Sequence, residues 1–359
     1  MRRIVSLSDN THRMVLVTGG TGLVGSHLLI ELLGRGKEVR AIRRPGSRLD
    51  NVCRIFRWYF PDRPEMFGRI QWVDGDVCDP SSLDEALKGI EEVYHCAAFV
   101  SFRRSDYPLI GSVNIRGTAN VVDACLQHGV KRLCHVSSIA ALGTSEDGRP
   151  VDERTPWNSG VRHSPYGLSK FAAEREVWRG IEEGLNAVIV NPSVILGPGE
   201  PHKASCRLFS AMEKGLSFYP PGANGFVDVR DVVRIMVILM EQGTSSQRFV
   251  VSGANSSYLE VFSTTARILG TRPPRFKVPA FGLKAIWRFN AVISFLLRIN
   301  PELTRETAHN AYITAAYDNG KISELLKYSF YSLEDTLKNV RGFCTANREY
   351  LHLQCRDGK

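Results

Sequence analysis

Through the first half of the chain, short apolar runs alternate with longer stretches in which apolar residues recur at helical spacing. The runs have the length of buried strands, and the longer stretches have the length of helices packed on a core. The predicted strands are Met14–Val17, Glu38–Arg43, Ile70–Asp74, Glu92–Cys96, Arg132–Val136, Ala187–Asn191 and Arg248–Val251. The predicted helices are Leu23–Leu33, Pro80–Leu87, Asn114–His128 and Pro165–Glu183. This alternation predicts an α/β fold, a doubly wound parallel sheet with helices on both faces.

Local signals mark several helix ends. Asp79 and Ser164 each precede a proline, which predicts a side-chain N-cap followed by a proline in the first helical turn. Gly34 and Gly36 follow the first predicted helix and can end it in a left-handed conformation.

Composition narrows the class of protein. Apolar residues make up 43% and charged residues 23% of the 359 residues, as in ordinary globular proteins. We expect a cytoplasmic protein, because no run of roughly eighteen apolar residues predicts a membrane span and residues 1–10 lack a signal-peptide core. The eight cysteines are scattered and the histidines show no metal-ligand spacing, so we expect free thiols and no metal site. The net charge is +9, and for the cations between residues 35 and 57 a phosphorylated cofactor is a better explanation than nucleic acid.

A glycine-rich segment joins the first predicted strand to the first predicted helix. Gly20, Gly22 and Gly25 have the spacing GxGxxG, and Gly19 extends it to GxxGxxG. Small residues at such a turn let a pyrophosphate approach the backbone, and its charge then lies at the helix N-terminus. The context predicts a dinucleotide-phosphate site. Its expected residues are Gly19, Thr21, Gly22, Leu23, Val24 and Gly25.

The end of the second predicted strand distinguishes the two nicotinamide cofactors. A site for NAD usually has an acid about 20 residues beyond the glycines, where it binds the ribose hydroxyls. Here Arg43 stands at that position, followed by Arg44 and Arg48. A guanidinium can bind a 2′-phosphate through two hydrogen bonds, whereas a carboxylate would repel it. NADP(H) is therefore favoured and NAD(H) is the alternative, with Arg43 as the main phosphate ligand and Arg44 as a helper.

Tyr166 and Lys170 stand four residues apart in a predicted helix, so they share one face. A free tyrosine titrates at about pH 10, and a nearby ammonium with an oxidised nicotinamide is expected to lower that pKa. Ser138 follows a predicted strand and can hold a substrate oxygen against Tyr166. A second match to the spacing, Tyr317 and Lys321, contains an Asn-Gly pair that favours a turn, and we set it aside.

From about Met14 to Phe330 the sequence resembles the extended short-chain dehydrogenases/reductases. The segment from Thr18 to Gly25 resembles their TGxxGxxG motif, and Tyr166 and Lys170 complete a tetrad with Asn114 and Ser138. In that tetrad the asparagine organises a proton relay. The resemblance implies further cofactor contacts by Asp76 and Val77 at the adenine, by Ala97 and Ala98 beside the cofactor, and by Pro192 and Val194 at the carboxamide.

Within the family, the sequence is most similar to the branch of 3β-hydroxysteroid dehydrogenases and dihydroflavonol reductases. It departs from the family at Asn191, because an arginine commonly precedes this proline. Family members are often dimers through a helix bundle beside the helix of the catalytic tyrosine. A homodimer is therefore an expected assembly.

The alternation of strands and helices ends after residue 191, where prolines and glycines accumulate. We expect residues 1–13 to form an arm and residues 14–191 to form the Rossmann dinucleotide-binding domain. Residues 192–359 are expected to be mainly a smaller, mainly helical substrate-binding lobe, with 226–252 returning to the Rossmann sheet.

The prediction for function is an oxidoreductase that moves hydride between NADP(H) and a ketone or secondary alcohol, with Tyr166 as the acid–base. The alternative is a nucleotide-sugar epimerase or dehydratase, enzymes that in this family retain NAD. Arg43 argues against retained NAD. Ile139 and Ala140 stand where sugar 4,6-dehydratases have an acidic pair.

Aromatic residues near the expected pocket favour an apolar or aromatic small-molecule substrate, although core packing explains them equally well. They are Phe99, Phe102, Phe209, Phe218 and Tyr219. Residues 281–299 are apolar and edged by cations, so they could contact a bilayer surface. Packing on the protein core is the favoured interpretation of this stretch.

Overall fold

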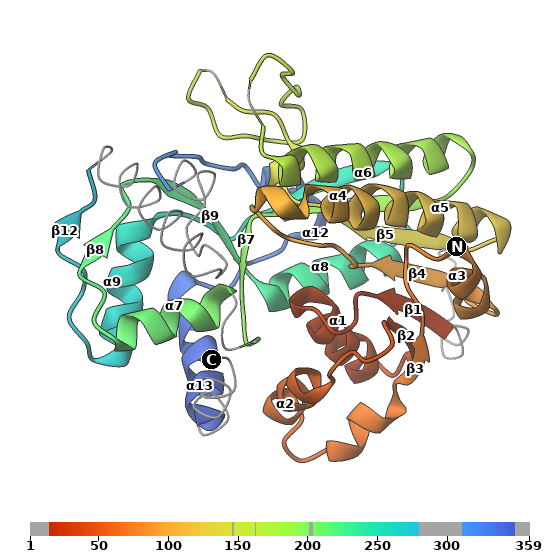
Figure 1. The fold of residues 1–359 in the computed structure, drawn as a ribbon, viewed down its shortest axis with the longest axis horizontal. Coiled ribbons are helices and arrows are strands. Elements are labelled where there is room, and N and C mark those ends of the chain that lie inside the picture. The colour runs from red at the N-terminus through yellow and green to blue at the C-terminus, as the bar shows by residue number, and fades with distance from the viewer. Residues whose placement is uncertain (1–13, 146, 162, 201–203, 280–310, 349–359) are drawn as a thin grey trace, which may run out of the picture.

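The computed structural model describes residues 14–145, 147–161, 163–200, 204–279 and 311–348. A seven-stranded parallel sheet runs through its centre in the order β10–β6–β5–β4–β1–β2–β3 (Figure 1). The strands are β1 (Met14–Thr18), β2 (Glu38–Arg43), β3 (Gln71–Asp74), β4 (Glu92–His95), β5 (Arg132–Val136), β6 (Ala187–Pro192) and β10 (Gln247–Val251). The predicted doubly wound α/β fold is confirmed.

Alternate residues of each strand enter two separate cores, because successive side chains of a strand point to opposite faces. Val15 and Val17 of β1 pack with α1 (Leu23–Gly34), α2 (Asp50–Tyr59) and α8 (Val229–Glu241). Leu16, between them, packs on the other face with α3 (Pro80–Leu87), α5 (Gly117–Gln127) and α6 (Pro165–Glu182). The two helix layers lie on opposite sides of the sheet in Figure 1. All six residues of β6 are buried, as expected of a strand covered on both faces.

Helix ends follow the expected side-chain chemistry. Asp79 accepts a hydrogen bond from the Ser81 amide, and Ser164 accepts one from the Gly167 amide. Gly36, at φ 77°, supplies the left-handed residue after α1, whereas Gly34 is still helical. Before α5, the chain forms a short helix α4 (Tyr107–Ile110) and a π-helical turn at Gly111–Arg116. Single 3₁₀ segments lie at Pro64–Arg69, Arg104–Asp106 and Ile139–Ala141.

The chain after β6 builds a lobe from helices and short strands around its own apolar cluster, at the left of Figure 1. Phe209, Phe226, Val261, Leu337 and Phe343 are at the centre of that cluster. The lobe's strands, which the sequence pattern did not predict, span two to six residues. They are β7 (Val194–Leu196), β8 (Phe218–Tyr219), β9 (Ala223–Asp228), β11 (Ala254–Ser257) and β12 (Phe276–Lys277). Its helices are α7 (Ala204–Glu213), α9 (Tyr258–Leu269) and α13 (Leu333–Ala346), and α12 (Gly320–Leu326) packs on β10.

Two expectations concern parts of the chain that are not described. The arm at residues 1–13 and the apolar stretch 281–299 lie outside the described residues. Among the helices that the structure describes, none is long and apolar enough to cross a membrane.

Candidate active site

The turn between β1 and α1 contains glycines at which any side chain would force the surrounding backbone to move. Gly19 has φ 68°, and a Cβ built on it would lie 2.6 Å from the Ala97 nitrogen. A Cβ on Gly25 would lie 2.1 Å from the Gly19 carbonyl oxygen. The glycines therefore let the first turn of α1 pack directly against the end of β1.

The N-terminus of α1 has the properties of an anion site. Its N-cap, Gly22, offers no side-chain hydrogen bond, and the first turn holds no acidic residue. The first amide groups of a helix have no partners within the helix, and the helix dipole favours negative charge there. A pyrophosphate fits this place, since its oxygens would accept from those amides.

Arg43 and Asp74 end the adjacent strands β2 and β3 at the same register position. Arg43 Nε donates to Asp74 Oδ1 at 2.9 Å, and both side chains are partly exposed. Arg44 is exposed, and Arg48 forms an ion pair with Asp50 at 3.0 Å. A carboxylate thus stands beside the guanidinium that the sequence assigned to a 2′-phosphate.

The residues expected to flank the cofactor lie at the same edge of the sheet. Asp76 Oδ1 accepts from the Cys78 amide at 2.9 Å, and Val77 is buried against Gly117. The Ala97 amide donates to Thr18 Oγ1 at 3.2 Å, which joins the end of β4 to the end of β1. Ala98 is exposed at this edge.

His95 sits between two threonines beneath the glycine turn. Thr118 Oγ1 donates to the Asn114 carbonyl, so His95 Nε2 donates to Thr118 and Nδ1 accepts from Thr18. This pattern requires the neutral ring, and burial lowers the pKa of His95 to about 3. The family resemblance places His95 at the start of the fourth-strand motif that ends in Ala97 and Ala98, and it gives the histidine no chemical role of its own.

Ser138, Tyr166 and Lys170 come together where β5 ends. Ser138 lies near enough to Tyr166 to lower the pKa of its hydroxyl. Lys170, only 2% exposed, donates from Nζ to the Val136 carbonyl oxygen at 2.8 Å. The ring of Phe102 stands edge-on to Tyr166 with 6.0 Å between centroids.

Asn114, in the π-helical turn, connects the loop after β4 to the helix of Tyr166. Its Oδ1 accepts from the Phe99 amide at 2.7 Å, and its Nδ2 donates to the Phe99 carbonyl and to Ser169 Oγ. Ser169 Oγ in turn donates to the Tyr166 carbonyl at 2.7 Å. The asparagine therefore holds Tyr166 by its main chain.

On balance, the protein's own groups do not lower the pKa of Tyr166. The lowering that we expected from the sequence requires a bound oxidised nicotinamide together with the nearby ammonium. Burial raises the pKa of Tyr166, and only Ser138 opposes that shift. Burial lowers the pKa of Lys170 to about 8, and the charge of Glu174 is the largest contribution that opposes this shift. The Lys170 ammonium is directed at the Val136 carbonyl. Tyr166 is therefore a protonated group at neutral pH.

The remaining candidates lie where β6 passes into β7. Pro192 is the last residue of β6 and is buried, whereas Val194 begins β7 and is 38% exposed. The rejected match does not form a helical pair, because Tyr317 bridges to Val151 and α12 begins only at Gly320. In the described part of the chain, no three His, Cys, Asp or Glu side chains are grouped as metal ligands.

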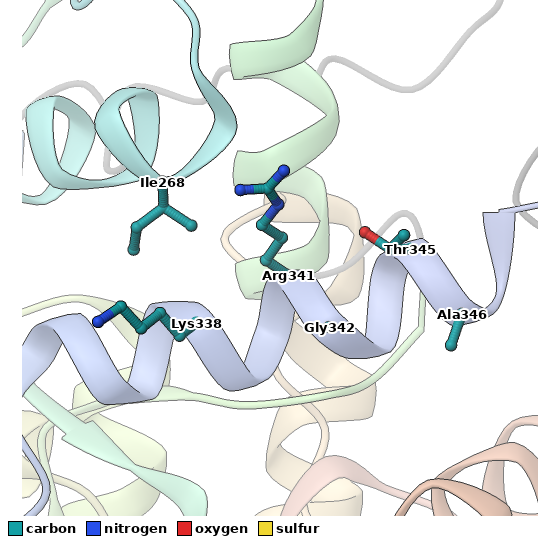
Figure 2. A pocket seen from close by; sticks show the side chains of 6 residues that line it. All are labelled: Ile268, Lys338, Arg341, Gly342, Thr345 and Ala346. Atoms are coloured by element: carbon teal, nitrogen blue, oxygen red, sulfur yellow. The ribbon is translucent and has the colours of Figure 1, made fainter.

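A separate surface cleft of about 500 Å³ lies between α9 and α13 (Figure 2). Lys338, Arg341 and Thr345 of α13 line it, together with Ile268 of α9. It belongs to the lobe and shares no lining residue with the site at the sheet edge.

Comparison with known proteins identifies the family. Residues 15–252 match the model of the NAD dependent epimerase/dehydratase family. The chain belongs to this family. The resemblance to extended short-chain dehydrogenases/reductases of the 3β-hydroxysteroid dehydrogenase and dihydroflavonol reductase branch is confirmed, and the chain is an NAD(P)-dependent oxidoreductase.

Relatives in this family span most of the chain. Sterol demethylase protein B of Methylococcus capsulatus is 32% identical over 271 residues, covering 74% of this chain and 77% of that protein. The sterol-4-alpha-carboxylate 3-dehydrogenase of Bos taurus is 27% identical and covers 91% of each chain.

Solved structures of the family share the fold. The crystal structure of gox2253 has a TM-score of 0.77 and 28% identity, covering 94% of this chain and 99% of that one. UDP-glucuronic acid 4-epimerase from Bacillus cereus, in complex with UDP-glucuronic acid and NAD, has a TM-score of 0.72 and 21% identity, covering 93% and 99%.

Proposed function

We propose that this epimerase/dehydratase-family enzyme is an NADP(H)-dependent oxidoreductase that interconverts a ketone and a secondary alcohol, with Tyr166 as the acid–base. The observation that carries the proposal is the buried Lys170, which stands four residues after Tyr166 on α6 and donates to the Val136 carbonyl oxygen two residues before Ser138. β1 and β5 run parallel in the central sheet (Figure 1), so the glycine turn after β1 and Ser138 after β5 lie at the same sheet edge, where a cofactor on the turn can reach the site.

The protonation state of Tyr166 suits reduction. A tyrosine hydroxyl is protonated at neutral pH and burial raises the pKa of Tyr166 further, so Tyr166 can give a proton to a carbonyl oxygen. Ser138 holds the same oxygen by a second hydrogen bond and orients it against Tyr166. Lys170 carries positive charge near the site and can bind the nicotinamide ribose. When bound, the nicotinamide supplies or accepts the hydride.

The cofactor preference rests on Arg43. Its ion pair with Asp74 uses Nε, and a 2′-phosphate would compete with that carboxylate for the guanidinium. The two charges act in opposite directions, because Asp74 repels a phosphate that Arg43 attracts. We therefore assign the preference for NADP(H) over NAD(H) to Arg43, and we assign to Asp74 a repulsion that makes this preference smaller.

For the substrate, we propose an apolar or aromatic carbonyl compound. Phe102 presents its ring to Tyr166, and Asn114 holds the main chain of Phe99 in the same loop. The names of two relatives point to sterols, which are apolar alcohols or ketones of this class. We assign the substrate side of the site to the lobe that follows residue 191.

The cofactor test is a fluorescence titration of purified protein with NADPH and NADH, after checking for cofactor retained through purification. We expect at least a tenfold preference for NADPH, about 1.4 kcal/mol. Arg43→Ala should abolish the preference, whereas Asp74→Asn should increase it. Retained NAD, or preference for NADH in the native protein, would overturn the assignment and favour the epimerase alternative.

A further inference from the structure

A buried carboxylate stands behind the proposed catalytic residues and has no part in the chemistry described so far. Glu174 lies one helical turn beyond Lys170 on α6 and is 2% exposed. Its Oε1 accepts a hydrogen bond from Asn191 Nδ2, and its Oε2 lies 3.3 Å from Arg248 Nη1. The carboxylate thus joins the helix of Tyr166 to the strands β6 and β10.

Its partners are themselves held in place. Asn191 is fully buried and also donates to the Ser138 carbonyl oxygen at 3.0 Å. Arg248 donates through Nη2 to the Glu153 carbonyl oxygen at 2.6 Å. Family members commonly have an arginine where this chain has Asn191 on β6. Here the guanidinium near that position comes from Arg248 on the neighbouring strand β10.

These contacts favour the ionised form of Glu174. A buried carboxylate without partners would take up a proton, and burial does raise the pKa of Glu174. The hydrogen bond from Asn191 and the charge of Arg248 oppose that shift. Such a buried charge is retained only where its partners are fixed, as they are here.

Glu174 is also the acidic residue one turn along α6 from Lys170, and both side chains are 2% exposed. From β4 and β5, His95 and His135 face the ammonium as neutral rings, because burial lowers the pKa of both. The Cys96 thiol stays protonated, since burial raises its pKa to about 12. Among the described groups around Lys170, Glu174 thus supplies the negative charge that opposes its desolvation.

We propose that Glu174 is a positioning residue for the reaction: its carboxylate keeps Lys170 charged at neutral pH and, through Asn191, fixes the main chain of Ser138. The inference rests on the proposed function for its catalytic meaning. The electrostatic link between Glu174 and Lys170 is testable without turnover.

The test replaces the charge with its near-isostere in Glu174→Gln and follows Lys170 in two ways. In NADPH-dependent turnover, the alkaline limb that reports loss of the Lys170 proton should move to lower pH by about one unit or more. The second readout is the free energy of unfolding of the cofactor-free protein, measured with urea. In the native protein it should rise with pH from about pH 8, because Lys170 then loses its proton and a buried charge no longer has to be kept from water. That rise should begin about one unit lower in the variant.

The matched control is Glu176→Gln on the same helix, because Glu176 pairs with Arg179 away from this network. It should change neither curve. Unshifted curves in a folded Glu174→Gln protein would overturn the proposal, and an equal loss of turnover at every pH would indicate a purely structural role. If native protein shows no turnover while the unfolding curves shift, the proposed function fails and the link stands.

If Glu174→Gln does not fold, Glu174→Asp keeps the charge on a shorter side chain. In Glu174→Asp, the alkaline limb of turnover and the pH at which the unfolding free energy begins to rise should both stay at their native values. The turnover itself should be reduced. A shift of one unit in this charged variant would refute the electrostatic role.

Discussion

Substituting Gly25 by alanine tests how the glycine turn builds the phosphate site. The added Cβ would lie 2.1 Å from the Gly19 carbonyl oxygen and 2.8 Å from the Gly20 Cα. Both neighbours are backbone atoms, so no side chain can rotate away. To reach the ordinary contact distance of 3.4 Å, α1 and the turn must separate by roughly 1.3 Å.

That separation is large on the scale of a hydrogen bond. An amide placed about 2.9 Å from a phosphate oxygen would lose its bond after such a movement. Overpacking of this kind costs about 1–3 kcal/mol of stability. An equal loss of binding free energy would raise the dissociation constant of NADPH by about 5- to 140-fold.

The assay combines NADPH titration by fluorescence with urea unfolding, and Gly34→Ala in the same helix is the matched control. A Cβ on Gly34 would meet only the Phe60 ring, at 3.6 Å. We expect this control to bind NADPH normally and to gain up to about 1 kcal/mol in unfolding free energy. If Gly25→Ala bound NADPH within twofold of the native protein at unchanged stability, the packing argument would be refuted.

Three further predictions follow from the structure. Tyr166→Phe should lower kcat by at least about a hundredfold while NADPH affinity stays within threefold, measured by steady-state kinetics and titration; retained activity would remove Tyr166 from the mechanism. Gly117→Ala should destabilise by about 1–3 kcal/mol, because its Cβ would lie 2.8 Å from Val77 Cγ2. In urea unfolding, the double variant with Val77→Ala should lose less stability than the two single variants added together, and simple additivity would contradict the clash. Burial lowers the pKa of His27 to about 4, so the unfolded chain binds more protons below pH 6.5 and stability falls as the pH drops from 6.5 toward 4. His27→Gln should reduce that slope by up to about 1.4 kcal/mol per pH unit, and an unchanged slope between pH 6 and pH 4.5 would contradict the assignment.

Sequence reasoning predicted the strands of the main sheet well because their signals are local. The run Met14–Val17 is apolar throughout, and the observed strand Met14–Thr18 extends it by one residue. The lobe strands β8 and β12 escaped prediction because two residues are too few to show a period. Their pairing depends on chain segments about sixty residues apart.

The amino-acid sequence alone determined the glycine turn, the placement of Tyr166 and Lys170 on one helix face and the order of strands and helices, because spacing along the chain dictates them. Only the tertiary structure decided which charges meet. Asp74 stands beside Arg43 because β2 and β3 end together, and Glu174 meets Asn191 and Arg248 because α6, β6 and β10 pack against one another. The direction of the Tyr166 pKa shift was likewise decided by burial, which is a property of the folded chain as a whole. These contacts join residues about 15–75 positions apart, and folding removes water from them. Neither the contacts nor the burial gives a repeating pattern in a single sequence, yet both decide the charges of the site.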